Sequence, residues 1–282
     1  MPRVAAAHCA PVALDKPAGI TLACETIARA GAEEVELLVF PETFIPGFPY
    51  WINLYPPGQQ HPMYVTYLAQ SVDIAAGELE PVCQAARDAG VAVVLGLSER
   101  VGSTMFNAQA FIAADGNLTG VHRKLQPTYA ERMLWGRGDG SGLFVADWPV
   151  GRTGGLICYE HMLNLPRQAL IDMGEQIHCA SWPTFAPLST RGGAYDRQVE
   201  VLMSAHALTA QCFVVMAQNH ITPAYIERMQ AELGPQTSLG TGGGRSAIWG
   251  PDGSLLAASP DGAGDMLVIA DLDLFANDRA RP

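Results

Sequence analysis

Three chemically reactive residues stand directly after apolar, strand-like runs, although they lie far apart in the chain. Glu42 follows VELLVFP, and Cys158 follows GGLI. Lys124 comes just after a third such run, which ends at His122. Reactive groups of α/β proteins collect where strands end and loops begin. A carboxylate, a thiol and an ammonium group delivered in this way would suffice for nucleophilic attack on an unsaturated carbon.

The three residue types divide the chemistry between them. The thiolate is the reactive form of cysteine, so the Cys158 thiol needs a base or a nearby cation. Glu42 can take the thiol proton and later activate water. Lys124 can stabilise the thiolate and then the charge that develops on the substrate, and the backbone N–H of Tyr159 can add a second donor. Singly, each residue also fits an inert core cysteine, a solvated turn or a surface charge.

Strand and helix patterns alternate along the whole chain, which is typical of an α/β protein. The predicted strands are 3–12, 35–40, 91–97, 107–113, 118–122, 155–158, 176–181, 212–218, a hairpin within 246–258, and 265–273. The predicted helices are 17–31, 62–70, 79–90, 165–174 and 191–210. Since no linker or charge block divides residues 1–282, we expect one domain. Two halves of similar rhythm suggest two sheets packed face to face, with helices outside.

The composition narrows the possible partners and the compartment. A net charge of −11 disfavours binding to nucleic acid or to an anionic membrane surface. With 49% apolar and only 16% charged residues, we expect partner subunits to cover part of the surface. Six cysteines without CxxC pairs indicate reduced thiols and a cytoplasmic protein. His8 and Pro11 interrupt the apolar N-terminus, which predicts a core strand and not a signal peptide.

No metal or cofactor is expected from the sequence. The seven histidines show neither an HExxH motif nor paired Cys/His ligand spacing. The glycines at 242–244 are not followed by the Gly-Lys-Ser/Thr of a phosphate loop.

Three motifs in the same order resemble those of the nitrilase superfamily of carbon–nitrogen hydrolases. They are FPETFIPGFPYW (40–51), HRKLQPTYAERMLWGRGDGSG (122–142) and GGLICYEH (154–161). IHCASWP and GGGRSAIWGPDGSLLA also resemble family segments, so the resemblance covers nearly the whole chain. It implies a four-layer α-β-β-α sandwich that pairs into a homodimer or a larger homo-oligomer. It also assigns the general base to Glu42, the lysine to Lys124, a second glutamate to Glu131 and the nucleophile to Cys158.

The segment around Lys124 resembles the nitrilase branch more than the amidases or carbamoylases. The implied reaction converts a small organic nitrile to a carboxylic acid and ammonia through a thioimidate and a thioester on Cys158. Two departures bear on substrate range, because Tyr159 stands where nitrilases usually have tryptophan and Asn164 where they usually have proline. An amidase or carbamoylase is the main alternative, and a non-catalytic interaction module is the distant one.

Aromatic residues in the motif loops are candidates for the substrate pocket and favour an aryl or arylalkyl substrate, although aromatic residues also fill ordinary cores. Tyr129 and Trp182 are the best two candidates of a set that is Phe48, Tyr50, Trp51, Tyr129, Trp135 and Trp182. His161 can equally pack in the core or touch substrate. Glu160 is expected to be structural, and Glu131 either holds Lys124 for catalysis or forms a purely structural ion pair.

Overall fold

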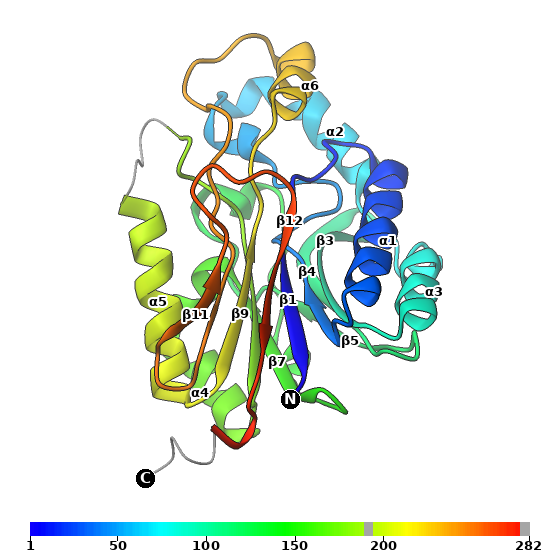
Figure 1. Cartoon of the computed structure of the whole chain (residues 1–282). Helices are drawn as coiled ribbons and strands as arrows, with labels where there is room; N and C mark the ends of the chain where they lie inside the picture. Colours follow the sequence, from blue (N-terminus) through cyan, green and yellow to red (C-terminus); the bar gives the residue numbers. More distant parts are fainter. Residues whose placement is uncertain (189–193, 277–282) are drawn as a thin grey trace.

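Two six-stranded sheets form the centre of the protein (Figure 1). The computed structural model describes residues 1–188 and 194–276. The first sheet contains, in spatial order, β12 (Met266–Asp271), β1 (Arg3–His8), β2 (Leu37–Val39), β3 (Ala92–Val101), β4 (Thr104–Ile112) and β5 (Leu118–Arg123). The second contains β11 (Leu255–Ala258), β10 (Ala247–Trp249), β9 (Phe213–Gln218), β8 (Ile177–Trp182), β7 (Gly151–Ile157) and β6 (Ala146–Trp148).

Helices cover the outer face of each sheet, so the predicted four-layer α-β-β-α sandwich is confirmed. Helices α1 (Lys16–Ala32) and α3 (Glu80–Ala89) pack on the first sheet, and α4 (Asn164–Asp172) and α5 (Ala194–Ala210) lie outside the second (Figure 1). Strand β1 shows how the sequence directs side chains to the two faces of a sheet. Val4 and Ala6 belong to the core between the sheets, whereas Ala5 and Ala7 pack under the helices. This alternation follows from the two-residue period of a strand.

The sheet topology brings the ends of several strands to one edge. Strands β1, β2 and β3 run parallel, and so do β7, β8 and β9. Strand β5 is antiparallel to β4, which is antiparallel to β3, so β5 again runs in the direction of β3. Glu42 therefore follows β2 and Lys124 follows β5 on the same edge of the first sheet, while Cys158 follows β7 of the second.

Most predicted elements are present, with differences at their ends. The first strand ends at His8 and not at residue 12, and Cys158 lies outside the strand to which it was assigned. Strand β6 and helix α6 (Pro223–Leu233) were not predicted. The first three residues of the predicted helix 191–210 lie outside the described residues, and α5 begins at Ala194. Among the helices of the described part, none is long and apolar enough to span a membrane.

Candidate active site

Glu42 is buried at the end of the β2 segment, and only one of its oxygens is hydrogen-bonded. Its Oε1 accepts hydrogen bonds from Nζ of Lys124 at 2.8 Å and from Nδ2 of Asn107 at 2.5 Å. Its Oε2 is also buried and has no partner among the described residues. Burial raises the pKa of Glu42 to about 7, against the lowering effect of the Lys124 charge. The carboxylate thus combines a fixed position, a free oxygen and the basicity that a general base needs near neutral pH.

Lys124 lies between two glutamates and has no exposed area. Its Nζ is 2.8 Å from Oε1 of Glu42 and 2.8 Å from Oε2 of Glu131. The same Glu131 oxygen accepts the Thr128 backbone N–H, so a short capping turn holds this carboxylate in place. Burial lowers the pKa of Lys124, but the charges of Glu131 and Glu42 outweigh it and keep this pKa well above its ordinary value. The lysine is therefore a fixed cation with one of its three N–H groups left for a ligand.

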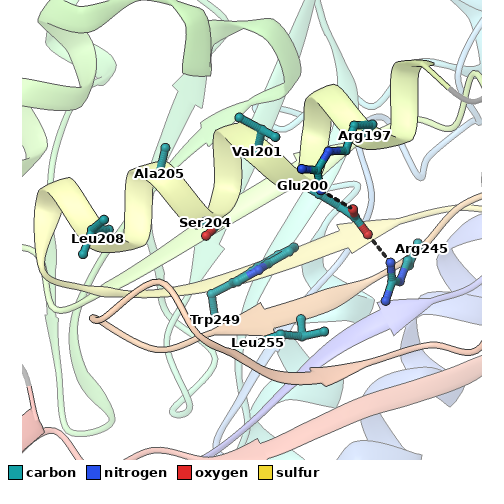
Figure 2. Close-up of a pocket in the computed structure, with 9 residues that line it drawn as sticks. All are labelled: Arg197, Glu200, Val201, Ser204, Ala205, Leu208, Arg245, Trp249 and Leu255. Atoms are coloured by element: carbon teal, nitrogen blue, oxygen red, sulfur yellow. Dashed lines mark hydrogen bonds and ion pairs between the residues drawn. The ribbon is translucent and has the colours of Figure 1, made fainter.

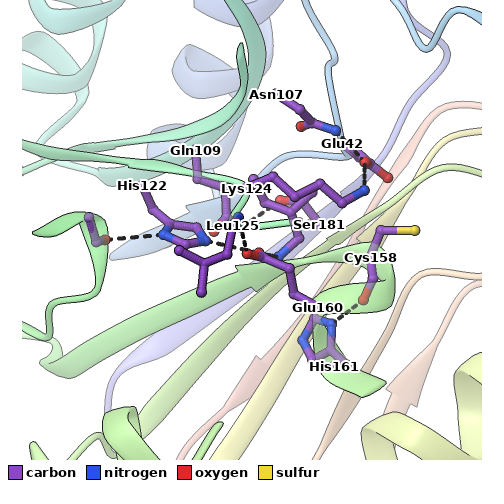
Figure 3. Close-up of polar contacts among 12 residues, drawn as sticks. Glu42, Asn107, Gln109, His122, Lys124, Leu125, Cys158, Glu160, His161 and Ser181 are labelled. Carbon is purple, nitrogen blue, oxygen red and sulfur yellow. Dashed lines mark hydrogen bonds and ion pairs between the residues drawn. The ribbon is translucent and has the colours of Figure 1, made fainter. Parts of the chain in front are cut away.

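Cys158 begins a short 3-10 turn, Cys158–Met162, immediately after β7. Its φ is 52°, in the left-handed region that costs a non-glycine residue free energy. The sulfur and one carboxylate oxygen each of Glu42 and Glu131 all lie within 4.8 Å of one another. Figure 3 shows the thiol on the same side as the Lys124 ammonium and the Glu42 carboxylate. The structure thus brings together the four residues that the motifs singled out.

The surroundings of Cys158 favour the protonated thiol over the thiolate. Burial and the Glu42 charge raise the pKa of Cys158 well above its ordinary value, although Lys124 and a hydrogen bond from the Tyr159 backbone N–H lower it. A thiol with a raised pKa attacks only as its proton leaves. Carboxylate oxygens of both Glu42 and Glu131 lie near the sulfur, and Glu42 has a buried oxygen without a partner among the described residues that can accept the proton.

Glu160 connects the cysteine turn to the lysine segment (Figure 3). Its carboxylate accepts the backbone N–H of Ile157 at 2.8 Å and that of Leu125 at 2.7 Å. The ring of His122 lies 2.9 Å from the same carboxylate. The turn carries Glu160 away from the thiol, so the structural role expected for it agrees with its contacts.

A sequence profile of the carbon–nitrogen hydrolase family matches residues 3–281. The chain belongs to the carbon–nitrogen hydrolase family. It is therefore a hydrolase that acts on carbon–nitrogen bonds other than peptide bonds.

Several relatives of this carbon–nitrogen hydrolase are nitrilases. The chain is 36% identical to a nitrilase of Pseudomonas syringae pv. syringae over 96% of its own length and 81% of the relative's. It is 36% identical to an aliphatic nitrilase of Rhodococcus rhodochrous, with 97% and 75% covered. It is 33% identical to an arylacetone-specific nitrilase of Alcaligenes faecalis, with 96% and 77% covered. These likenesses make the chain a nitrilase-type carbon–nitrogen hydrolase.

Solved structures agree on the fold. A Glu-to-Gln variant of the amidase from Nesterenkonia sp. AN1 superposes with a TM-score of 0.73 at 22% identity, covering 100% of this chain and 97% of the amidase. A carbon–nitrogen hydrolase from Helicobacter pylori G27 gives a TM-score of 0.75 at 17% identity, with 99% and 92% covered.

The predicted pocket residues of this carbon–nitrogen hydrolase occupy different environments. Trp182 is fully buried in the hydrophobic cluster that contains Cys158. Trp51 is buried in the same cluster, packs edge-on against Tyr67, and lines a surface cavity of about 210 Å³. Tyr129, by contrast, is 77% exposed and is not part of that cluster. The pocket role expected for Tyr129 therefore stays a prediction.

His161 packs against the backbone of Cys158 and the ring of Trp182. Its Nδ1 is 2.6 Å from the Cys158 carbonyl oxygen, and its ring stacks on Trp182 with centroids 5.3 Å apart. Of the two options left open by the sequence, the geometry matches packing.

Neither the thiol nor the lysine reaches the surface. The side chains of Cys158 and Lys124 have no exposed area. The surface cavity of about 550 Å³ shown in Figure 2 lies elsewhere, between α5 and the β10–β11 hairpin. A substrate can therefore reach Cys158 only when neighbouring side chains move.

Two clusters within the described residues place three potential metal ligands close together. In the first, formed by Glu42, Glu131 and Cys158, the Lys124 ammonium already balances both carboxylates. In the second, formed by Glu175, His206 and Cys212, the carboxylate accepts hydrogen bonds from histidines. The expectation that no metal is needed stays a prediction.

Asn107 and two histidines were not identified from the sequence. Asn107 lies on β4 and donates a hydrogen bond to Glu42 across the sheet. His178 and His206 both contact the Glu175 carboxylate, close to the Cys158–Met162 turn. Asn107 stands in a predicted strand next to the segment that carries Lys124, but only the sheet register shows that the two face the same carboxylate.

Proposed function

We propose that this chain is a nitrilase that hydrolyses an organic nitrile to the carboxylic acid and ammonia. The observation that carries the proposal is the convergence of a buried thiol, a carboxylate with one free oxygen and a fixed ammonium. Nitrilases that are 33–36% identical over nearly the whole chain support the choice of nitrile as substrate.

In the first half of the reaction, the Cys158 thiol gives its proton to Oε2 of Glu42 as the sulfur bonds to the nitrile carbon. One π bond of the nitrile opens, and its nitrogen takes this proton from Glu42 to form a thioimidate, which returns Glu42 to its carboxylate form. The free N–H of Lys124 and the Tyr159 N–H face the region where negative charge develops, so both stabilise it. Glu131 keeps the ammonium in place and charged.

In the second half, Glu42 removes a proton from water as the oxygen bonds to the thioimidate carbon. Glu42 passes this proton and then the hydroxyl proton to the nitrogen, so that the tetrahedral species expels ammonia and leaves a thioester. A second water, activated in the same way, displaces the Cys158 thiolate and releases the acid. If the tetrahedral species expels the thiolate instead of ammonia, the product is the amide.

An aryl or arylalkyl nitrile is our proposed substrate class. The hydrophobic cluster around Cys158 includes Phe48, Trp135 and Trp182, which can pack against an aromatic ring. The relatives do not decide this point, since an aliphatic nitrilase and an arylacetone-specific one are similarly identical to the chain.

The test is ammonia release from paired nitriles and amides, with aliphatic, aryl and arylacetonitrile members in the panel. We expect ammonia from a nitrile and little from its matched amide. Alkylation of Cys158, located by peptide mass spectrometry, should abolish turnover, as should Cys158→Ala. Cys83→Ala, which changes a thiol on α3, should leave turnover intact. Faster release from amides than from nitriles would favour the amidase or carbamoylase alternative.

We also propose that the chain assembles into a homodimer or larger homo-oligomer. Figure 2 shows Val201, Ala205 and Leu208 along one side of α5, beside the cavity. Val201 is 50% exposed, Leu208 55% and Leu255 on β11 50%, which is unusual for neighbouring large apolar side chains. Light scattering should give at least twice the 30.1 kDa chain mass, and Leu208→Glu should lower it. A monomeric wild-type protein at micromolar concentration would refute the assembly.

The cytoplasm is the proposed compartment, because all six cysteines are free thiols in the structure. A small nitrile is the proposed partner, and no nucleic acid or membrane is proposed.

A further inference from the structure

A continuous line of buried polar groups runs from the nucleophile into the layer beneath it. The Cys158 carbonyl oxygen contacts Nδ1 of His161 at 2.6 Å, and Nε2 of His161 lies 2.8 Å from Nε2 of His178. Nδ1 of His178 is 3.0 Å from Glu175, whose other oxygen is 3.2 Å from Nε2 of His206. We call His161, His178 and Glu175 the histidine relay. All three are fully buried or nearly so, and the reaction described above uses none of them.

The partners fix where the protons of the relay sit. A carbonyl oxygen only accepts, so Nδ1 of His161 carries a proton, and Nδ1 of His178 carries one toward the Glu175 carboxylate. The contact between the two Nε2 atoms needs one more proton. Two imidazoles with three ring protons hold one positive charge. Nδ1 of His206 accepts from Nε of Arg167 at 3.0 Å, so its Nε2–H donates to Glu175 and this ring is neutral.

The ionised state of Glu175 agrees with this assignment of the ring protons. Burial opposes ionisation, but His178 and His206 lower the pKa of Glu175 to about 2. Burial, with His178 and His206, holds the pKa of His161 well below its ordinary value, and the Glu175 carboxylate lies at the other end of this pair of imidazoles. The other titratable groups around the relay are the guanidinium of Arg167 and the thiols of Cys179 and Cys212. The relay is thus a buried ion pair that ends in a hydrogen bond to the nucleophile's own peptide group.

The C=O and the N–H of the Cys158–Tyr159 peptide face different partners. Within the described residues only the Ile45–Pro46 bond is cis, so the Cys158–Tyr159 peptide is trans and its C=O and N–H point in opposite directions. The carbonyl faces His161, and the N–H of Tyr159 faces the sulfur. A flipped peptide would direct the carbonyl toward the thiolate and remove a donor from the site. Since the left-handed φ of Cys158 is costly, the surrounding bonds must hold it.

We propose that the histidine relay positions and polarises the Cys158–Tyr159 peptide, so that the Tyr159 N–H stabilises the thiolate and the anionic intermediates. His161 acts as a positioning residue because it touches the peptide and not the substrate. The positive charge of the two imidazoles draws electron density toward the carbonyl, which makes the N–H a stronger donor. This inference rests on the proposed role of Cys158 as nucleophile.

The test measures the rate at which iodoacetamide alkylates Cys158, by peptide mass spectrometry, across pH 6–10 in the full-length protein. His161→Leu removes the hydrogen bond to the carbonyl, and His161→Asn retains an amide donor there but breaks the contact with His178. Glu175→Gln removes the charge that fixes the relay protons. His8→Asn is the matched control, because His8 is another fully buried histidine whose bonds go to Ser246 and Ala263.

We expect alkylation of Cys158 to shift to higher pH in His161→Leu and Glu175→Gln and to stay unchanged in His8→Asn. With a nitrile that is turned over, kcat should fall by roughly 10²-fold in His161→Leu, with KM within about threefold. His161→Asn should lie between His161→Leu and wild type, and circular dichroism identifies any variant that is unfolded. An unchanged pH profile in folded His161→Leu or His161→Asn would overturn the inference. A shifted profile without nitrile turnover would instead count against the proposed function.

Discussion

The Glu160 carboxylate accepts the backbone N–H of Leu125 at 2.7 Å and so fixes the lysine segment relative to the cysteine turn. Leu125 follows Lys124 directly, and Glu160 lies two residues after Cys158. Lys124 follows a strand of the first sheet, and Cys158 follows a strand of the second. This hydrogen bond therefore joins the segments that carry the two residues and helps to set the distance between the Lys124 ammonium and the Cys158 thiol.

Glu160→Gln should reduce turnover without altering any group that touches substrate. The amide offers one oxygen and an NH₂ group, so it cannot accept from both Ile157 and Leu125. We expect kcat to fall by about 10²-fold, and urea unfolding to show a loss of roughly 2–3 kcal/mol. Glu78→Gln is the matched control, since Glu78 likewise accepts a backbone N–H, that of Asp73, and contacts a basic side chain, that of Lys16. Equal kcat losses in both variants would argue against a positioning role.

The pH profile of kcat/KM should report the ionisation of Glu42. Its pKa of about 7 means that the carboxylate accepts the thiol proton above that pH and is itself protonated below it. Activity should therefore rise through pH 7 and level off above it. An activity that is flat from pH 5 to 8 would exclude Glu42 as the base.

Asn107→Leu provides a sharper version of that experiment. Asn107 donates to Oε1 of Glu42 and so favours the charged carboxylate. Its loss should raise the pKa of Glu42 and move the acid limb of the profile to higher pH. Gln109→Leu removes another buried amide of β4, one whose bonds go to β8, and should leave the limb in place.

Lys124→Met should cost both activity and stability, because it leaves Glu42 and Glu131 buried without their cation. Breaking a buried ion pair in this way costs about 3–5 kcal/mol, and turnover should fall by at least roughly 10³-fold. The double variant Lys124→Met/Glu131→Gln removes one of the stranded charges. It should recover part of the unfolding free energy but none of the turnover. Recovery of turnover would show that Lys124 only neutralises Glu131.

Acid should destabilise the protein through Glu175. Its pKa is about 2 when folded and near its ordinary 4.5 when unfolded, so the unfolded chain takes up the proton first as pH falls. The stabilisation, about 3 kcal/mol, is complete above pH 4.5 and is lost between pH 4.5 and 2. In Glu175→Gln, the free energy of unfolding measured with urea should change little between pH 4.5 and 2. Glu25→Gln, at an exposed position of α1, should keep the pH dependence of the wild type. A wild-type slope in Glu175→Gln would show that Glu175 is not charged in the fold.

Sequence patterns predicted the order of most strands and helices because apolar runs here are long and well separated. They missed β6, which has only three residues, and α6, whose apolar side is small. Glu42, Lys124, Glu131 and Cys158 were identified because they lie in three motifs that resemble those of the nitrilase superfamily, with Lys124 and Glu131 in the same one. The contacts of Asn107, Glu160 and His178 depend on sheet register and on the turn after β7, which no local pattern specifies. The exposure of Tyr129 could not be predicted for a similar reason, since a position in a motif says nothing about exposure.

The Glu42 carboxylate and the Lys124 ammonium are carried by one sheet and the Cys158 sulfur by the other. The thickness of the core between the sheets therefore sets the distance between the sulfur and the other two groups. Phe111, on β4 of the first sheet, and Val215, on β9 of the second, both belong to that core. A thicker or thinner core would move the Cys158 sulfur relative to the Glu42 carboxylate, even if both residues were unchanged. Packing volume in the middle of the sandwich is therefore a determinant of rate as well as of stability.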